Sequence, residues 1–159
     1  MTPENEGRWK CIGVIHVNGE PKGQPRVKAF YNKQIGKARV YTPGTAERWK
    51  MDIAIAAHDF IKSNNALLPI TGPVRVDSTF LFQRPQRLMR KRDPCGLVLH
   101  TSKPDRDNLD KAVLDTLSSL GIWTDDAQAC SGLIEKYYVE KGGIPGASIS
   151  ISILKEGLL

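Results

Sequence analysis

Two acids and an amine lie close together in the stretch KPDRDNLDKAVLDTL, residues 103–117. Pro104 has a fixed φ and disfavours the helical region for the residue before it, so we expect a helix to begin directly after this proline. Asp105 occupies the expected N-cap position. Asp107 follows in the first turn, and Lys111 lies four residues further on, where the two side chains are neighbours on the exposed side of the helix. The stretch therefore gathers two carboxylates and an amine at one helix start.

A second acidic pair follows this helix in the sequence GIWTDDAQ, residues 121–128. If a strand returns alongside the helix, Asp126 can fold back toward the helix start, and three carboxylates then converge. Like charges at such close range raise one another's pKa and are costly unless a cation lies between them. Oxygen ligands without a thiolate or imidazole suit Mg²⁺ or Mn²⁺. The pattern favours a metal site, although acids in a first helical turn and an i,i+4 ion pair are also ordinary features of a solvated helix.

A calcium-binding EF-hand is excluded by position. Counted from Asp105, its loop requires Gly at the sixth residue and Glu at the twelfth, and the residues found there are Asp110 and Thr116. The acidic run is therefore not a calcium loop.

Two helices must support this region, as the apolar spacing indicates. The acidic helix has a buried stripe formed by Leu109, Val113, Leu117 and Leu120. The other helix is predicted to be capped at Thr45 and to run to about Ser63. Its apolar face consists of Trp49, Ile53, Ala56, Ala57 and Phe60 or Ile61.

Strands make up the rest of the predicted fold. Residues 74–82 alternate strictly, with Val74, Val76, Ser78, Phe80 and Phe82 on one face. Other strands are predicted at residues 9–17, 40–41, 98–100, 129–139 and 147–154, the last two joined as a hairpin at Gly142-Gly143. This order predicts an α+β fold, a single domain with one mixed sheet and two main helices packed on it. We expect a disordered N-terminus at residues 1–8 and a domain at residues 9–159.

Composition narrows the class of protein. The chain has 159 residues and a net charge of +6, with 23 Lys and Arg against 17 Asp and Glu, which suits a polyanionic partner. Its three cysteines are widely spaced, which indicates neither a disulfide framework nor a metal motif and favours the cytoplasm. The apolar runs are too short to span a bilayer, and the polar first residues do not resemble a signal peptide.

Two basic segments could contact such a polyanion. The first is broken by Pro and Gly and contains Lys22, Arg26 and Lys28. The second leads to the acidic helix and contains Arg84, Arg87, Arg90, Lys91 and Arg92, with Lys103 further on. Either could be a solvated charge run. For the first segment, a solvated loop and phosphate contacts that flank a cleft both stay open. We interpret the second segment, residues 83–103, as a flexible basic loop that clamps a DNA backbone.

The two acidic motifs, KPDxDNLxKAxxDxL and GxWxDDAQ, together resemble the core signature of the RusA family of Holliday junction resolvases. Residues 23–50, which contain GQPRVKAFYN and VYTPGTAERWK, are similar to the Pro-Arg segment and helix entry of that family. The resemblance covers about half of the chain, and the long motifs occur in the correct order.

The resemblance implies a Mg²⁺-dependent endodeoxyribonuclease, in which Mn²⁺ can substitute, that resolves four-way DNA junctions by paired nicks in recombination and repair. It implies that Asp105, Asp107 and Asp126 bind the metal and that Lys111 is catalytic. It also implies a homodimer, which agrees with the need for two opposed nicks. We assign Asn108, Asp125 and His100 as candidate supporting residues around these acids.

Two other classes stay open from the sequence. One is a catalytically inactive module that binds branched DNA. The other is a metal-dependent phosphatase or nucleotide hydrolase that uses the same acids on small substrates. Intact acids argue against the first class, and the many arginines between residues 84 and 92 exceed what a mononucleotide requires.

Overall fold

The computed structural model describes residues 7–41 and 43–155. Residues 1–6 of the predicted disordered N-terminus lie outside these ranges. Gly7 and Arg8 form a 3-10 turn, and the Arg8 carbonyl accepts a hydrogen bond of 2.9 Å from the Lys155 N–H.

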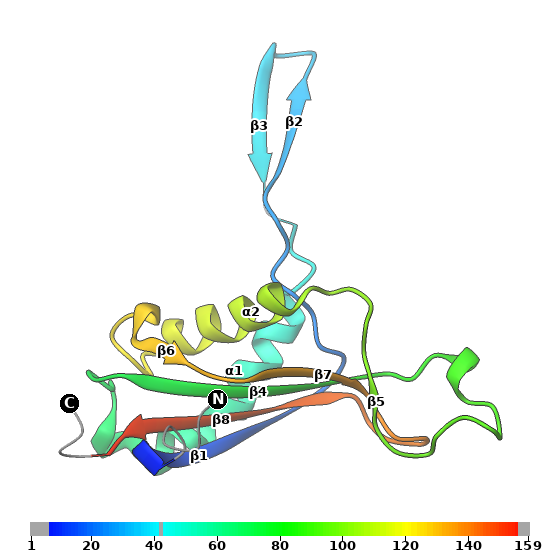
Figure 1. The fold of residues 1–159 in the computed structure, drawn as a ribbon. Helices are drawn as coiled ribbons and strands as arrows, with labels where there is room; N and C mark the ends of the chain where they lie inside the picture. The colour runs from blue at the N-terminus through cyan, green and yellow to red at the C-terminus, as the bar shows by residue number, and fades with distance from the viewer. Residues whose placement is uncertain (1–6, 42, 156–159) are drawn as a thin grey trace.

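A six-stranded mixed sheet forms the centre of the domain (Figure 1). The strand order is β1-β8-β4-β7-β5, and β6 also pairs with β4. β8 runs antiparallel to both β1 and β4, whereas β6 and β7 run parallel to β4. The bounds are β1 (Trp9–Asn18), β4 (Val74–Phe82), β5 (Val98–Leu99), β6 (Ala129–Ser131), β7 (Ile134–Tyr138) and β8 (Gly146–Leu154).

Two helices, α1 (Glu47–Asn64) and α2 (Arg106–Ser119), share one hydrophobic core with the sheet. The expected alternation of β4 is confirmed, because the side chains at 74, 76, 78, 80 and 82 are all buried. From α1, Trp49, Ile53, Ala57 and Phe60 enter this core, and from α2, Leu109, Val113 and Leu117 do so. The predicted α+β fold with two main helices on a mixed sheet is therefore confirmed. In the described ranges, neither helix is long and apolar enough to cross a membrane.

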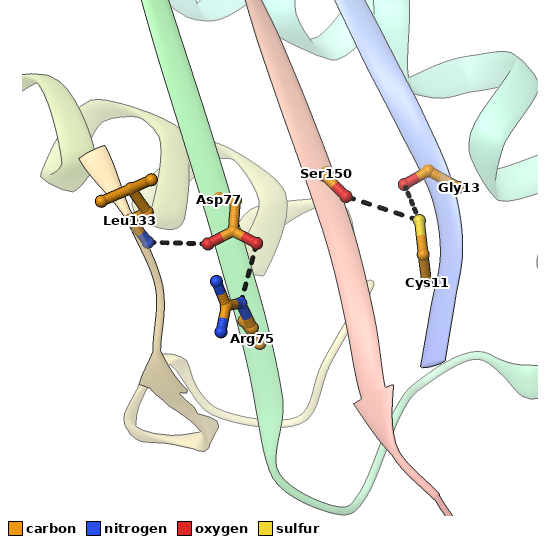
Figure 2. A network of polar contacts seen from close by, with 6 residues as sticks. All are labelled: Cys11, Gly13, Arg75, Asp77, Leu133 and Ser150. Carbon is orange, nitrogen blue, oxygen red and sulfur yellow. Dashed lines mark hydrogen bonds and ion pairs between the residues drawn. The ribbon is translucent and has the colours of Figure 1, made fainter. Parts of the chain in front are cut away.

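The opposite face of the sheet is largely polar. Figure 2 shows Arg75 and Asp77 on β4, with Arg75 Nε donating to the Asp77 carboxylate at 2.8 Å. Next to them lie Ser150 on β8 and Cys11 on β1, with 3.4 Å between Oγ and Sγ. An antiparallel sheet commonly has one such solvated face.

The single strand predicted at residues 129–139 is wrong, because the structure divides it into β6 and β7. At Gly132 the chain passes so close to the Val76 carbonyl that a Cβ would collide with it. The Asp77 carboxylate also accepts a hydrogen bond of 2.7 Å from the Leu133 N–H (Figure 2). These contacts fix the interruption between the two strands.

The predicted hairpin between the last two strands is also wrong. β7 and β8 lie on opposite sides of β4, so the connection that contains Gly142 crosses over one strand instead of joining neighbours. Gly142 has a φ of +84°, so the turn itself was correctly placed. At α1, the N-cap is Ala46 and not the predicted Thr45, and no side chain caps the helix.

A separate two-stranded ribbon, β2 (Lys28–Asn32) and β3 (Lys37–Tyr41), projects from the domain (Figure 1). From the sequence we expected only a short strand here, at residues 40–41. The turn at residues 33–36 includes Gly36 with a φ of +62°, and the Gln34 N–H donates to the Asn32 side chain at 3.0 Å. A glycine in this conformation and an Asn-based turn are common in hairpin loops.

Candidate active site

The start of α2 presents two free carboxylates. Asp105 is the N-cap, as predicted, but its side chain makes no capping hydrogen bond. Asp107 lies in the first turn, and both residues are exposed. Within the described ranges, neither carboxylate has a hydrogen-bond or ion-pair partner. Both groups are therefore available to a cation or a substrate.

Lys136 on β7 holds in place the segment of chain that leads into α2. Its ammonium group donates to the carbonyls of Ser102 and Pro104, at 2.8 and 2.7 Å. It lies on the same face of its strand as the buried Tyr138, because these positions alternate with Tyr137. Our sequence interpretation missed this residue. The available signal was a lysine at an inward-facing position of a predicted strand.

The segment at residues 23–26 packs against the first turns of α2. The Gln24 N–H donates to the Asn108 carbonyl at 2.7 Å. A Cβ at Gly23 would lie only 3.0 Å from the Cβ atoms of Pro104 and Asn108, so this close approach depends on glycine. Asn108 thus supports the site through its backbone.

Together these elements enclose an open cleft of about 460 Å³. Its lining includes the Asp105 carboxylate together with the two cationic residues Arg26 and Lys103. A carboxylate next to two cations can hold a metal ion and a phosphate at the same place. The structure therefore brings together predicted residues from two separate stretches of sequence, Arg26 from one and Lys103 and Asp105 from the other. Lys22 is exposed on the same segment, and Lys28 begins the projecting ribbon.

Lys111 does not pair with Asp107, which was the ordinary i,i+4 alternative that the sequence spacing left open. Its ammonium group lies 3.3 Å from the Asp115 carboxylate, one turn further along α2. The lysine side chain is 60% exposed, and an i,i+4 pair of this kind contributes only about 0.3–0.5 kcal/mol. A phosphate can therefore displace Asp115 from Lys111 at little cost.

Asp126 begins a short 3-10 helix, η4 (Asp126–Gln128), which a capping box stabilises. The Asp125 carboxylate accepts from the Ala127 N–H, and the Gln128 side chain accepts from the Asp125 N–H, both at 2.8 Å. Gln128 Nε2 also donates to the carbonyls of Ile70 and Gly72. Asp125 therefore supports the conformation of the turn, while Asp126 stays exposed.

The three predicted metal-binding acids are not clustered. In the part of the chain that the structure describes, no three acidic, histidine or cysteine side chains are close enough to hold an ion together. The strand that follows η4 pairs with β4, and its residues share a cavity with Asp110 and Leu114 in the middle of α2. The chain reaches the start of α2 only in β7, where Lys136 bonds to the Pro104 carbonyl, and Asp126 lies ten residues before that point. Asp105 and Asp107 alone fit Mg²⁺, which commonly uses one or two carboxylates, waters and substrate phosphates.

His100 is a packing residue and not part of the acidic cleft. Its ring stacks on Phe82 at 4.0 Å and contacts Tyr138 at 4.5 Å, measured between centroids. The residue is buried, and its Nδ1 has no hydrogen-bond partner. Burial lowers the pKa of His100 from its ordinary value of 6.5, and the Lys136 charge lowers this pKa further.

This pKa shift predicts a pH-dependent stability. Above pH 6.5 the imidazole is neutral in the folded and the unfolded chain, so its contribution to stability is complete there. As the pH falls below 6.5, the unfolded chain binds the proton first, and the free energy of unfolding decreases by up to about 1.4 kcal/mol per pH unit. Urea unfolding between pH 5 and 8 measures this slope. His100→Phe retains the stacking and should flatten the curve; an unchanged slope would contradict this account.

Arg84 is not a DNA contact in this structure, contrary to the prediction. The residue is only 3% exposed, and Nε donates to the Val139 carbonyl at 2.9 Å. The rest of its guanidinium donates to the carbonyls of Leu88, Pro94 and Gly96. Arg84 therefore connects the start of the basic loop to its middle and to the Val139 carbonyl.

Residues 83–103 therefore have internal structure, where we had expected a flexible loop. A short 3-10 helix, η3 (Gln86–Leu88), lies within it. Lys141 donates through Nζ to the carbonyls of Arg90 and Asp93, both at 2.7 Å. Five cations of this segment are exposed, namely Arg87, Arg90, Lys91, Arg92 and Lys103.

An α+β domain with free carboxylates beside exposed cations has the site chemistry expected of an enzyme that cleaves phosphate esters. The family model described as endodeoxyribonuclease RusA matches residues 18–152, which include every element of the cleft. The chain is also 31% identical to the uncharacterized protein YqaN of Bacillus subtilis (strain 168) over 136 residues, covering 82% of this chain and 90% of that protein. The chain belongs to the RusA family of endodeoxyribonucleases.

Proposed function

We propose that this protein is a Mg²⁺-dependent, structure-specific endonuclease that resolves four-way DNA junctions by paired nicks, in cytoplasmic DNA recombination and repair. The observation that carries the proposal is the pair of unpartnered carboxylates at the start of α2, one of which, Asp105, lines a cleft together with Arg26 and Lys103. The family match supports a DNA substrate.

In this proposal, Asp105 and Asp107 hold the metal, which polarises the phosphoryl oxygens and lowers the pKa of a water when bound. Arg26 and Lys103 bind the phosphate flanking the scissile bond. Lys111 leaves Asp115 and neutralises the charge that develops on the phosphate. Asp126, the third acid predicted from the sequence, is exposed but does not cluster with the other two acids in the part of the chain that the structure describes, so it is not assigned to this metal site.

The direct test is cleavage of a fixed four-way junction against a matched linear duplex, with Mg²⁺, with Mn²⁺ and with a chelator. We expect symmetric nicks on the junction, dependent on the metal. Hydrolysis of mononucleotides without DNA cleavage would instead favour a nucleotide hydrolase, and binding without any cleavage would favour an inactive module.

We further propose a homodimer, because one cleft makes one nick and a junction requires two at related positions. A C₂ pair is the simplest arrangement that supplies them. Leu133, 42% exposed, and Tyr137, beside Glu135 on the polar face of the sheet, are available for an interface. Ile134 packs toward the core and is not. Sedimentation with and without a junction tests this; a monomer in both conditions would contradict paired nicking.

Neutralising the basic loop should weaken binding to every DNA shape. In Arg87→Gln/Arg90→Gln/Arg92→Gln, we expect the slope of log K against log[salt] to become shallower by roughly three units, about one for each lost phosphate contact. Binding measured from 50 to 300 mM salt gives this slope. A slope equal to that of the wild type would show that the three arginines are only solvated.

A further inference from the structure

The β2–β3 ribbon forms no part of the main sheet. Its strands pair only with each other, and every described residue of β3 is exposed. In Figure 1 it extends well away from the two helices and the sheet. Five residues of extended strand span about 17 Å, more than the width of a DNA major groove, which is about 12 Å.

The register gives this ribbon two different faces. Paired residues share a face, so Lys28, Lys37, Arg39 and Tyr41 lie on one side, together with Asn32. The other side carries Ala29, Tyr31, Ala38 and Val40. Lys33 adds a cation in the turn, and no acid occurs from Val27 to Tyr41. The ribbon therefore has a cationic face and a small apolar face.

The base of the ribbon lies beside the candidate active site. Four residues before β2, the Gln24 N–H donates to the Asn108 carbonyl on α2. Arg26, two residues before β2, lines the same cleft as Asp105. A polymer bound at the cleft therefore passes the point where the ribbon leaves the domain.

We propose that the β2–β3 ribbon is a DNA-binding arm that inserts into a groove next to the cleaved phosphate. Its cationic face contacts the backbone, and Tyr31 and Val40 contact sugars and base edges. The major groove admits a two-stranded ribbon of this kind. The positive charge of the ribbon favours DNA over a second copy of the chain as its partner, because two ribbons would bring eight cations together without a counter-charge. This inference rests on the proposed nuclease function.

Photo-crosslinking from the turn tests the placement. A benzophenone amino acid replaces Ile35, which is 46% exposed, in the full-length chain. The matched control carries it at Ile55, which is 67% exposed and lies beside Asp52 and Asp59. We expect crosslinks to labelled junction from position 35 and none from position 55. Crosslinks from position 35 to a second protein chain in place of DNA would overturn the proposal.

A charge series tests the cationic face. Lys37→Gln/Arg39→Gln should make the salt slope of DNA binding shallower by about two units. Lys10→Gln/Lys62→Gln removes the same charge from β1 and α1 and should leave the slope unchanged. If all three proteins have equal salt slopes and the wild type still nicks DNA, the ribbon is not a DNA-binding arm. If the wild type neither binds nor nicks DNA, the proposed nuclease function is itself wrong.

Discussion

Asp107→Asn should lower the rate of junction nicking by roughly a thousandfold or more, while junction binding stays at or above the wild-type level. The carboxylate is exposed and unpartnered, so its loss removes a metal ligand without breaking any contact of the fold. A catalytic metal supplies several kcal/mol of transition-state stabilisation, and losing it lowers the rate by roughly a thousandfold or more. Without metal, a neutral amide also removes the repulsion between Asp107 and the phosphate. Parallel nicking and binding assays measure both effects.

The matched control is Asp110→Asn, which makes the same change one turn further along α2. Burial raises the pKa of Asp110, and the Arg106 charge opposes this shift. The ionised carboxylate is therefore less stable in the folded chain than in the unfolded chain, so the amide should raise the thermal midpoint and leave nicking intact. If Asp107→Asn retained wild-type turnover, Asp107 would not be part of the active site.

Arg84→Met should destabilise the basic loop by on the order of 3 kcal/mol. The arginine donates one buried and three part-buried hydrogen bonds to backbone carbonyls, and methionine leaves these four acceptors without their partner. We expect rapid proteolysis between Gln86 and Gly96 and weaker DNA binding, with the domain still folded.

The control for this change is Arg87→Met, which removes an exposed arginine three residues away. Substitutions at such positions usually change stability by less than about 0.5 kcal/mol. Limited proteolysis and urea unfolding of both variants separate the two effects. Equal resistance of the two loops to protease would show that Arg84 does not anchor the segment.

The elements with strong periodicity were predictable from the sequence. β4 alternates over its whole length, and α2 follows a proline with apolar residues at helical spacing, so burial alone specifies both. The division of β6 from β7 was not predictable, because it depends on contact of Gly132 with a strand about 55 residues earlier. The connection through Gly142 was not predictable either. Its turn depends on neighbouring residues, but the strands that β8 pairs with are distant in the sequence.

The site was predictable only in part, for a related reason. Asp105 and Asp107 share one helix start, so their proximity follows from the sequence. The position of Asp126 depends on which strand β6 pairs with, and sequence spacing does not contain that choice. Arg84 could not be told from Arg87, since its partners are backbone carbonyls that no residue pattern identifies. Lys136 was overlooked because a lysine that directly follows Glu135 in the strand resembles a solvated position.

The anchoring of the basic loop has a consequence for substrate preference. Arg84 and Lys141 bind its main chain, so the path of the loop is largely independent of the side chains that it displays. Residues 87, 90, 91 and 92 can therefore be exchanged as a set, like the variable loops of a binding scaffold, without rebuilding the domain. Under the proposed function, related enzymes can diversify the DNA shapes they engage by changing this surface alone, and the same positions are suited to directed evolution of altered specificity.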